Sequence, residues 1–180
     1  MPQRDFIHRV LATRSRDPIL HHIAPLGLAA GAGHCLVIDL DRSSPGNSKR
    51  TLSDLVGDGI RSADLEARSG VAVLGNGGIS FSDAAPTIDR LLSVWGRVVF
   101  RDGGDSHPFR VLQVEPILPD PFQPDLADVV QATSRGQTAG GRPLLPPLRH
   151  HQIRSILAGT IEPRWRWVRA WQTVWSTPWA

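Results

Sequence analysis

The hydrophobic residues of this chain gather into short runs that alternate with helical patterns. Such runs are typical of buried strands, because the strands of a parallel sheet are covered on both faces. The hydrophobic runs occupy residues 6–12, 35–40, 71–74 and 97–100, with a further candidate at 109–114. The alternation of strands with helices predicts an α/β fold: one mostly parallel sheet of four or five strands flanked by helices.

Helix-start and helix-stop residues lie between the predicted strands. Asp17 is expected to cap a helix that begins at Pro18 and runs to about residue 30, with a kink or early end at Pro25. Further helices are expected at 51–56, at 62–66 and, after a cap at Ser82, at 83–94. We expect the first two strands to pair directly in parallel, through a right-handed crossover.

The composition changes after residue 115, which divides the chain into three parts. Residues 1–115 form the predicted α/β domain. Residues 116–147 are rich in proline, glycine and polar side chains, and they predict an irregular segment with one amphipathic stretch around 126–132. Residues 148–180 predict a helical tail, rich in arginine and tryptophan, that packs on the domain; it has one helix over 148–158 and a second over the tryptophans.

Composition narrows the class of protein. With 180 residues, 41% of them hydrophobic, the chain can bury the core of one domain. Its net charge is +3, and its bases are scattered arginines apart from Lys49, which favours a compositional bias over a nucleic-acid interface. The single cysteine, Cys35, fits a reducing compartment. Without a signal pattern or an apolar stretch of ~20 residues, the sequence predicts a cytoplasmic protein with no transmembrane segment.

Asp39 and Asp41 are the main candidates for chemistry, because they end a hydrophobic strand and ligands of parallel sheets bind beyond the strands' carboxyl ends. The run 36–41, followed by Pro45-Gly46-Asn47 and by 51–55, resembles the MinD/ParA group of deviant-Walker P-loop ATPases. The resemblance covers roughly residues 34–105. It implies that Asp41 would help to position magnesium and the attacking water.

The phosphate-binding loop of that family is missing. A phosphate cradle needs a glycine-rich loop and a lysine, whereas the stretch from Ala12 to Pro18 contains neither. The resemblance therefore implies a degenerate, non-hydrolysing member that holds no cofactor. Such a protein is expected to act as an accessory or scaffold through contacts with an unidentified protein partner, or as a homo-oligomer.

Two other interpretations of the aspartates stay open. They also resemble the first motif of haloacid-dehalogenase-type phosphatases, which would make Asp39 the nucleophile and Asp41 the general acid/base, with magnesium as cofactor and Asp102 and Asp105 at the metal site. Arg42 follows Asp41 where that family has Gly-Thr. In the other interpretation the pair has a structural role: Asp39 caps the strand and Asp41 starts an Asx turn.

Glycine and histidine clusters offer weaker candidates. The turn from Gly75 to Gly78 could cradle an anion with its amides, although glycines at a strand end usually form a plain turn. His21-His22 and His150-His151 are adjacent pairs on predicted helices. Adjacent helical residues point about 100° apart, so neither pair forms a chelating face.

The tail carries the most specific interaction hypothesis. On a helix its tryptophans form one broad apolar face, with arginines at the start and on the flank. This face is expected to pack on the chain's own sheet, or else to bind a partner protein, an anionic membrane surface or nucleic acid. The candidate partner-binding residues are Trp167, Trp171, Trp175, Arg166 and Arg169.

Overall fold

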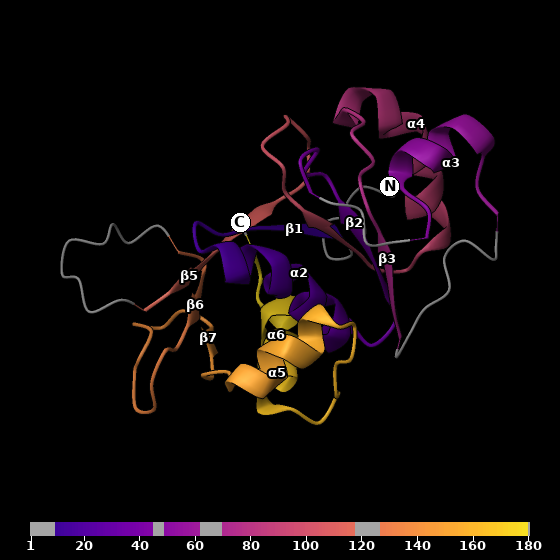
Figure 1. Ribbon diagram of the computed structural model, residues 1–180. Helices are drawn as coiled ribbons and strands as arrows, with labels where there is room; N and C mark the ends of the chain where they lie inside the picture. The colour runs from indigo at the N-terminus through magenta and orange to yellow at the C-terminus, as the bar shows by residue number, and fades with distance from the viewer. Residues whose placement is uncertain (1–9, 45–48, 62–69, 118–126, 180) are drawn as a thin grey trace.

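A computed structural model describes residues 10–44, 49–61, 70–117 and 127–179. Over these ranges the chain forms a single seven-stranded sheet with helices on both faces (Figure 1). All the strand pairs are parallel. The predicted α/β class is therefore confirmed, whereas the expected four or five strands are too few.

The strands follow the order β3-β2-β4-β1-β5-β6-β7 across the sheet. Their bounds are β1 Val10–Arg14, β2 Cys35–Asp39, β3 Val71–Leu74, β4 Val98–Arg101, β5 Val111–Pro116, β6 Val129–Gln131 and β7 Leu144–Leu145. The helices are α2 Pro18–Ala32, α3 Leu52–Asp58, α4 Phe81–Val94, α5 His150–Leu157 and α6 Arg166–Ser176. The helix expected at 62–66, and residues 6–9 of the first expected strand, lie outside the described residues.

Strand β4 lies between β1 and β2, so the expected direct pairing of the first two strands is wrong. Val99 is registered with Leu11 of β1 and with Val37 of β2. Each of these three strands contains a short, buried apolar run that ends in a polar residue. Such runs can pair with one another in many orders, so the local pattern does not determine which strand takes the central place.

Two strands occupy the segment that was expected to be irregular. β6 pairs with β5, and β7 pairs with β6, which extends the sheet beyond β5. Residues 127–132, part of the expected amphipathic stretch, contain β6. With three and two residues, β6 and β7 are too short to show a periodic pattern, and their pairing partners stabilise them.

Side chains alternate between two hydrophobic cores, one on each face of the sheet, as the period of two in a strand requires. Val37 and Val99 point into the core under α2, α5 and α6. Ile38 and Phe100, the next residues along, point into the core under α3 and α4. The sheet is thus the middle of three layers (Figure 1).

Helix α2 begins as the sequence predicts. Asp17 accepts a hydrogen bond from the Leu20 backbone N–H at 2.8 Å, and the helix ends at Gly33, whose φ of 88° suits a residue without a side chain. The helix continues through Pro25 without ending early. Helix α4 is capped by Ser80, which accepts from the Asp83 N–H, so the expected cap at Ser82 is wrong by two residues.

Candidate functional site

Polar side chains gather at the carboxyl ends of the central strands. Asp39 ends β2 and is registered with Arg101, the last residue of the neighbouring β4. Arg101 is registered in turn with Thr13 near the end of β1, and Asn76 follows β3. Because these strands are adjacent and parallel, their polar ends meet at the edge where α/β sheets bind ligands.

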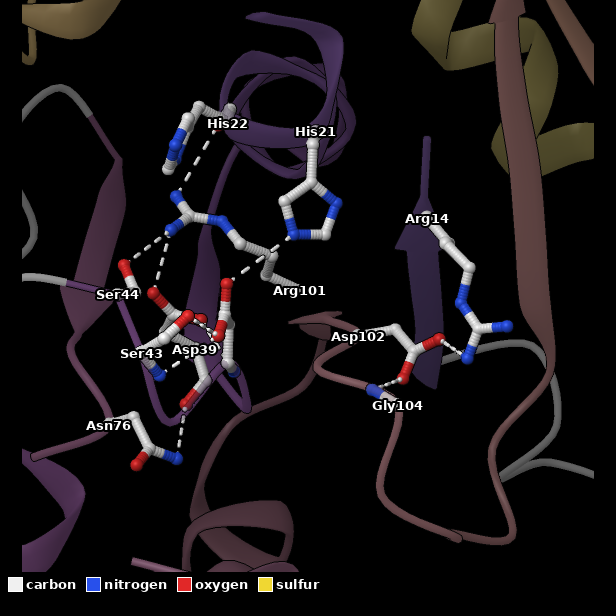
Figure 2. Close-up of polar contacts among 11 residues, drawn as sticks. Arg14, His21, His22, Asp39, Ser43, Ser44, Asn76, Arg101, Asp102 and Gly104 are labelled. Carbon is white, nitrogen blue, oxygen red and sulfur yellow. Dashed lines mark hydrogen bonds and ion pairs between the residues drawn. The ribbon is translucent and has the colours of Figure 1, made fainter. Parts of the chain in front are cut away.

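A buried ion pair occupies the middle of this edge. The Arg101 Nη1 donates to the Asp39 Oδ2 at 2.7 Å, and the two side chains are 11% and 7% exposed. Nη1 also donates to the Ser44 Oγ at 3.1 Å, and Nη2 donates to the His22 carbonyl at 3.4 Å (Figure 2). Arg101 therefore neutralises Asp39 and links β2, the loop after it and the first turns of α2.

Asp41 starts an Asx turn, as the structural interpretation expected, and Asp39 accepts a hydrogen bond at the end of β2. The Asp41 backbone N–H donates to the Asp39 Oδ1 at 2.9 Å. The Asp41 Oδ1 accepts from the Ser43 N–H at 3.0 Å and from the Ser43 Oγ at 2.7 Å. Partial burial alone would raise the Asp41 pKa, but the Ser43 hydrogen bonds and the nearby His21 and Arg101 lower it overall.

His21 lies beside this turn on the first part of α2. Its Nε2 is 3.9 Å from the Asp41 Oδ2, and its Nδ1 is buried with no hydrogen-bond partner among the described residues. Burial, followed by the charge of Arg101, lowers the His21 pKa from its ordinary value. The surroundings therefore favour the neutral form of the imidazole.

Asp102 forms a second cluster at the end of β4. Its carboxylate is fully buried, and it pairs with Arg14, accepts from the Gly104 N–H at 2.9 Å and contacts the His107 Nε2 at 3.3 Å. Burial would raise the Asp102 pKa, but the contacts with His107, Gly104 and Arg14 together lower it. Figure 2 shows this carboxylate turned toward Arg14.

The aspartates proposed for a metal site are engaged by cations and amides of the chain itself. Arg101 holds Asp39, whereas Arg14 and His107 hold Asp102. Asp105 accepts a hydrogen bond from the Phe81 N–H at 3.2 Å. Within the described ranges, no group of three or more histidine, cysteine, aspartate or glutamate side chains could hold a metal ion.

The backbone around the ion pair is closely packed. A Cβ on Gly103 would lie within 3.0 Å of the Leu40 carbonyl, so only glycine allows the loops after β2 and β4 to approach this closely. Gly77 has a φ of 76° and lies against the Thr51 side chain. The Asn76 Nδ2 donates to the Asp39 carbonyl at 3.2 Å. These contacts favour the turn interpretation of the glycine cluster over an anion cradle.

The structure also disfavours nucleophilic chemistry at the Cys35 thiol. Cys35 is fully buried at the start of β2. Burial raises the pKa of its thiol to about 12, so the thiolate form is absent at neutral pH.

The tryptophans of the tail are placed mainly inside the protein. Trp167 and Trp171 on α6 are buried against α2, and Trp175 is half-buried. The Trp167 Nε1 donates to the Gln131 Oε1 at 2.8 Å, and the Trp175 Nε1 donates to the Leu28 carbonyl at 2.8 Å. A partner can reach Trp167 and Trp171 only if α6 leaves α2. The flanking Arg166 and Arg169 are exposed.

Sequence reasoning missed Arg101, which holds the site together. Arg101 follows three apolar residues at the end of a strand, as Asp39 does, so both were visible as polar strand ends. Their pairing depends on β4 lying next to β2, whereas the sequence pattern led us to expect β1 next to β2. Arg14 was missed for the same reason, since it meets Asp102 only when β1 lies next to β4. His107, five residues after Asp102, was missed as well.

No protein-family model matches this chain, and a search of curated proteins found no match. None of the described helices is both long and apolar enough to cross a membrane.

Proposed function

We propose that this protein is a non-catalytic accessory or scaffold protein, built on a degenerate MinD/ParA-like fold, that acts in the cytoplasm through contacts with other proteins. The Asp39–Arg101 ion pair carries this proposal. It fills the carboxyl edge of the sheet, which is where a parallel α/β protein would bind a nucleotide or a phosphoryl group. A phosphate or a metal ion would have to displace a buried charge pair.

The start of α2 supports the same conclusion. Helix N-termini bind phosphate when their amides are free and a glycine-rich loop leads into them. Here the Asp17 carboxylate already accepts from the Leu20 N–H. The negative charge of Asp17 would also repel an anion at this position.

Calorimetry with ATP and magnesium tests the proposal directly. We expect no heat of binding for the wild-type protein with ATP, ADP or GTP, with or without magnesium. A magnesium-dependent affinity that disappears in Asp41→Ala would contradict the proposal and restore a nucleotide role. Asp89→Asn is a suitable control, because Asp89 is an exposed aspartate on α4, away from this edge.

The alternative function is that of a phosphoryl-transfer enzyme that uses Asp39. Asp39 would have to attack phosphorus while Arg101 holds its carboxylate. We expect no magnesium-dependent hydrolysis of a generic phosphate ester by the wild-type protein. Turnover that Asp39→Asn abolishes in a folded protein would establish the enzyme in place of the scaffold.

A further inference from the structure

Acidic residues are scarce in the C-terminal part of this chain, so the net positive charge lies there. Beyond residue 135 lie six of the 20 lysine and arginine residues but only one of the 17 acidic residues. Five of these arginines are exposed on α5, on α6 or next to these helices: Arg149, Arg154, Arg164, Arg166 and Arg169. We call these five residues the basic surface. Both helices pack on α2, so the basic surface belongs to the outer layer on that face of the sheet (Figure 1).

The basic surface has one acidic residue close to it in the sequence, Glu162. None of its five arginines forms an ion pair with a carboxylate in the described part of the chain. Several arginines elsewhere are paired with carboxylates, as in Arg14–Asp102, Arg101–Asp39 and Arg110–Asp128. The exposed guanidinium groups of the basic surface are therefore available to an external anion.

The placement of these charges is also unfavourable for the isolated chain. Arg149 precedes α5 and Arg166 begins α6, and neither helix has an acidic residue in its first turn. The N-terminal end of a helix carries partial positive charge, which repels cations there. An anionic group bound at the basic surface would relieve this repulsion at both helices.

Apolar groups among the arginines indicate the kind of partner. Leu157, at the end of α5, is 56% exposed, and Trp165, just before α6, is half-buried. Arginine and tryptophan beside exposed aliphatic area are typical of protein interfaces. Insertion into lipid would need the apolar face of α6, but its Trp167 and Trp171 are buried against α2. A nucleic-acid surface would not require the apolar groups.

We infer that the basic surface is a docking site for an acidic segment of a partner protein, one that carries aliphatic side chains between its carboxylates. This inference rests on the proposed scaffold function and names the chemistry of its partner. Arginine suits the role because its guanidinium binds carboxylates in a bidentate manner. The exposed Leu157, three residues after Arg154 on α5, supplies an apolar contact beside the charged ones.

A labelled glutamate-rich peptide with interspersed leucines is the probe, and fluorescence anisotropy measures its affinity. We expect the wild-type protein to bind it with an affinity that falls as salt is raised. Arg166→Glu/Arg169→Glu should weaken binding by about tenfold or more, because it reverses two charges of the surface. This variant should stay folded, since both side chains are exposed and an acid at the start of α6 suits the helix dipole.

Arg90→Glu/Arg135→Glu is the matched control, because it changes the net charge equally at exposed positions outside the basic surface. The control should bind like the wild type. Equal loss in both variants, or no binding of the peptide by the wild type, would overturn the inference. Tighter binding of single-stranded DNA, or of phosphatidylglycerol vesicles, than of the peptide would also overturn it. The calorimetry with ATP and magnesium tests the scaffold proposal separately. A failure of that proposal can therefore be distinguished from a failure of the docking inference.

Discussion

Arg101 and Asp39 form the interaction on which the carboxyl edge depends. Both side chains are largely removed from water, so each carries a desolvation penalty that the other offsets. Loss of one partner leaves an uncompensated charge in the protein, whereas loss of both removes the charges together. The contributions of the two side chains to the free energy of unfolding are therefore expected to be coupled.

We predict that Arg101→Met lowers the free energy of unfolding by about 3–5 kcal/mol, because Asp39 is left as a buried unpaired carboxylate. In the double variant Asp39→Asn/Arg101→Met the loss should be smaller than the sum of the two single losses. Urea unfolding of the four proteins measures this coupling. Additive losses would show that the two side chains do not stabilise each other.

Helices α2 and α6 approach each other closely because α2 lacks side chains where the tryptophans of α6 lie. A Cβ on Gly27 would fall within 3.0 Å of the rings of both Trp167 and Trp171. A Cβ on Gly31 would meet the Trp171 Cβ at 2.9 Å. The glycines weaken α2 as a helix, but they allow two large aromatic rings to be buried.

We predict that Gly27→Ala destabilises the protein by about 1–3 kcal/mol, as is usual when a packed core receives extra volume. Gly57→Ala is the control, because Gly57 lies on α3 with nothing within 4 Å of its added Cβ. The control should stabilise α3 by roughly 0.5–1 kcal/mol, since alanine is the better helix former. Chemical denaturation compares the two, and equal effects would mean that α6 does not pack on Gly27.

Acid sensitivity depends in part on the assembled sheet, because Arg14 of β1 meets Asp102 only after β1 and β4 pair, whereas Gly104 and His107 are local partners. The folded-state pKa of Asp102 lies below that of an unfolded aspartate, about 3.9. Its carboxylate therefore stabilises the fold above about pH 4. This contribution is lost as the pH falls below about 4 and through the depressed folded-state pKa.

We predict that Asp102→Asn loses about 1.5–3 kcal/mol of stability at neutral pH, since hydrogen bonds to a charged group are removed. Its unfolding free energy should also fall less steeply than that of the wild type between pH 4 and lower values. Thermal or urea unfolding across pH measures both effects. Asp89→Asn, at an exposed position on α4, should keep the wild-type profile.

Local patterns in the sequence determined the strands β2 and β3, the capped start of α2 at Asp17 and the α/β class. These features depend on residues close together in the chain, so hydrophobic periodicity and capping chemistry reveal them. Asp39 and Asp41 were likewise recognisable as polar residues at a strand end, and their turn geometry was among the roles expected.

Only the tertiary structure decided that β4 lies between β1 and β2, that β6 and β7 extend the sheet, and that Arg101 neutralises Asp39. The physical reason is the same in each case. Strand order, short paired strands and ion pairs between distant residues depend on contacts across the sheet, and several arrangements satisfy the same local pattern. The apolar face of α6 was evident from its spacing, but the folded chain was needed to show that Gly27 and Gly31 of α2 accommodate it.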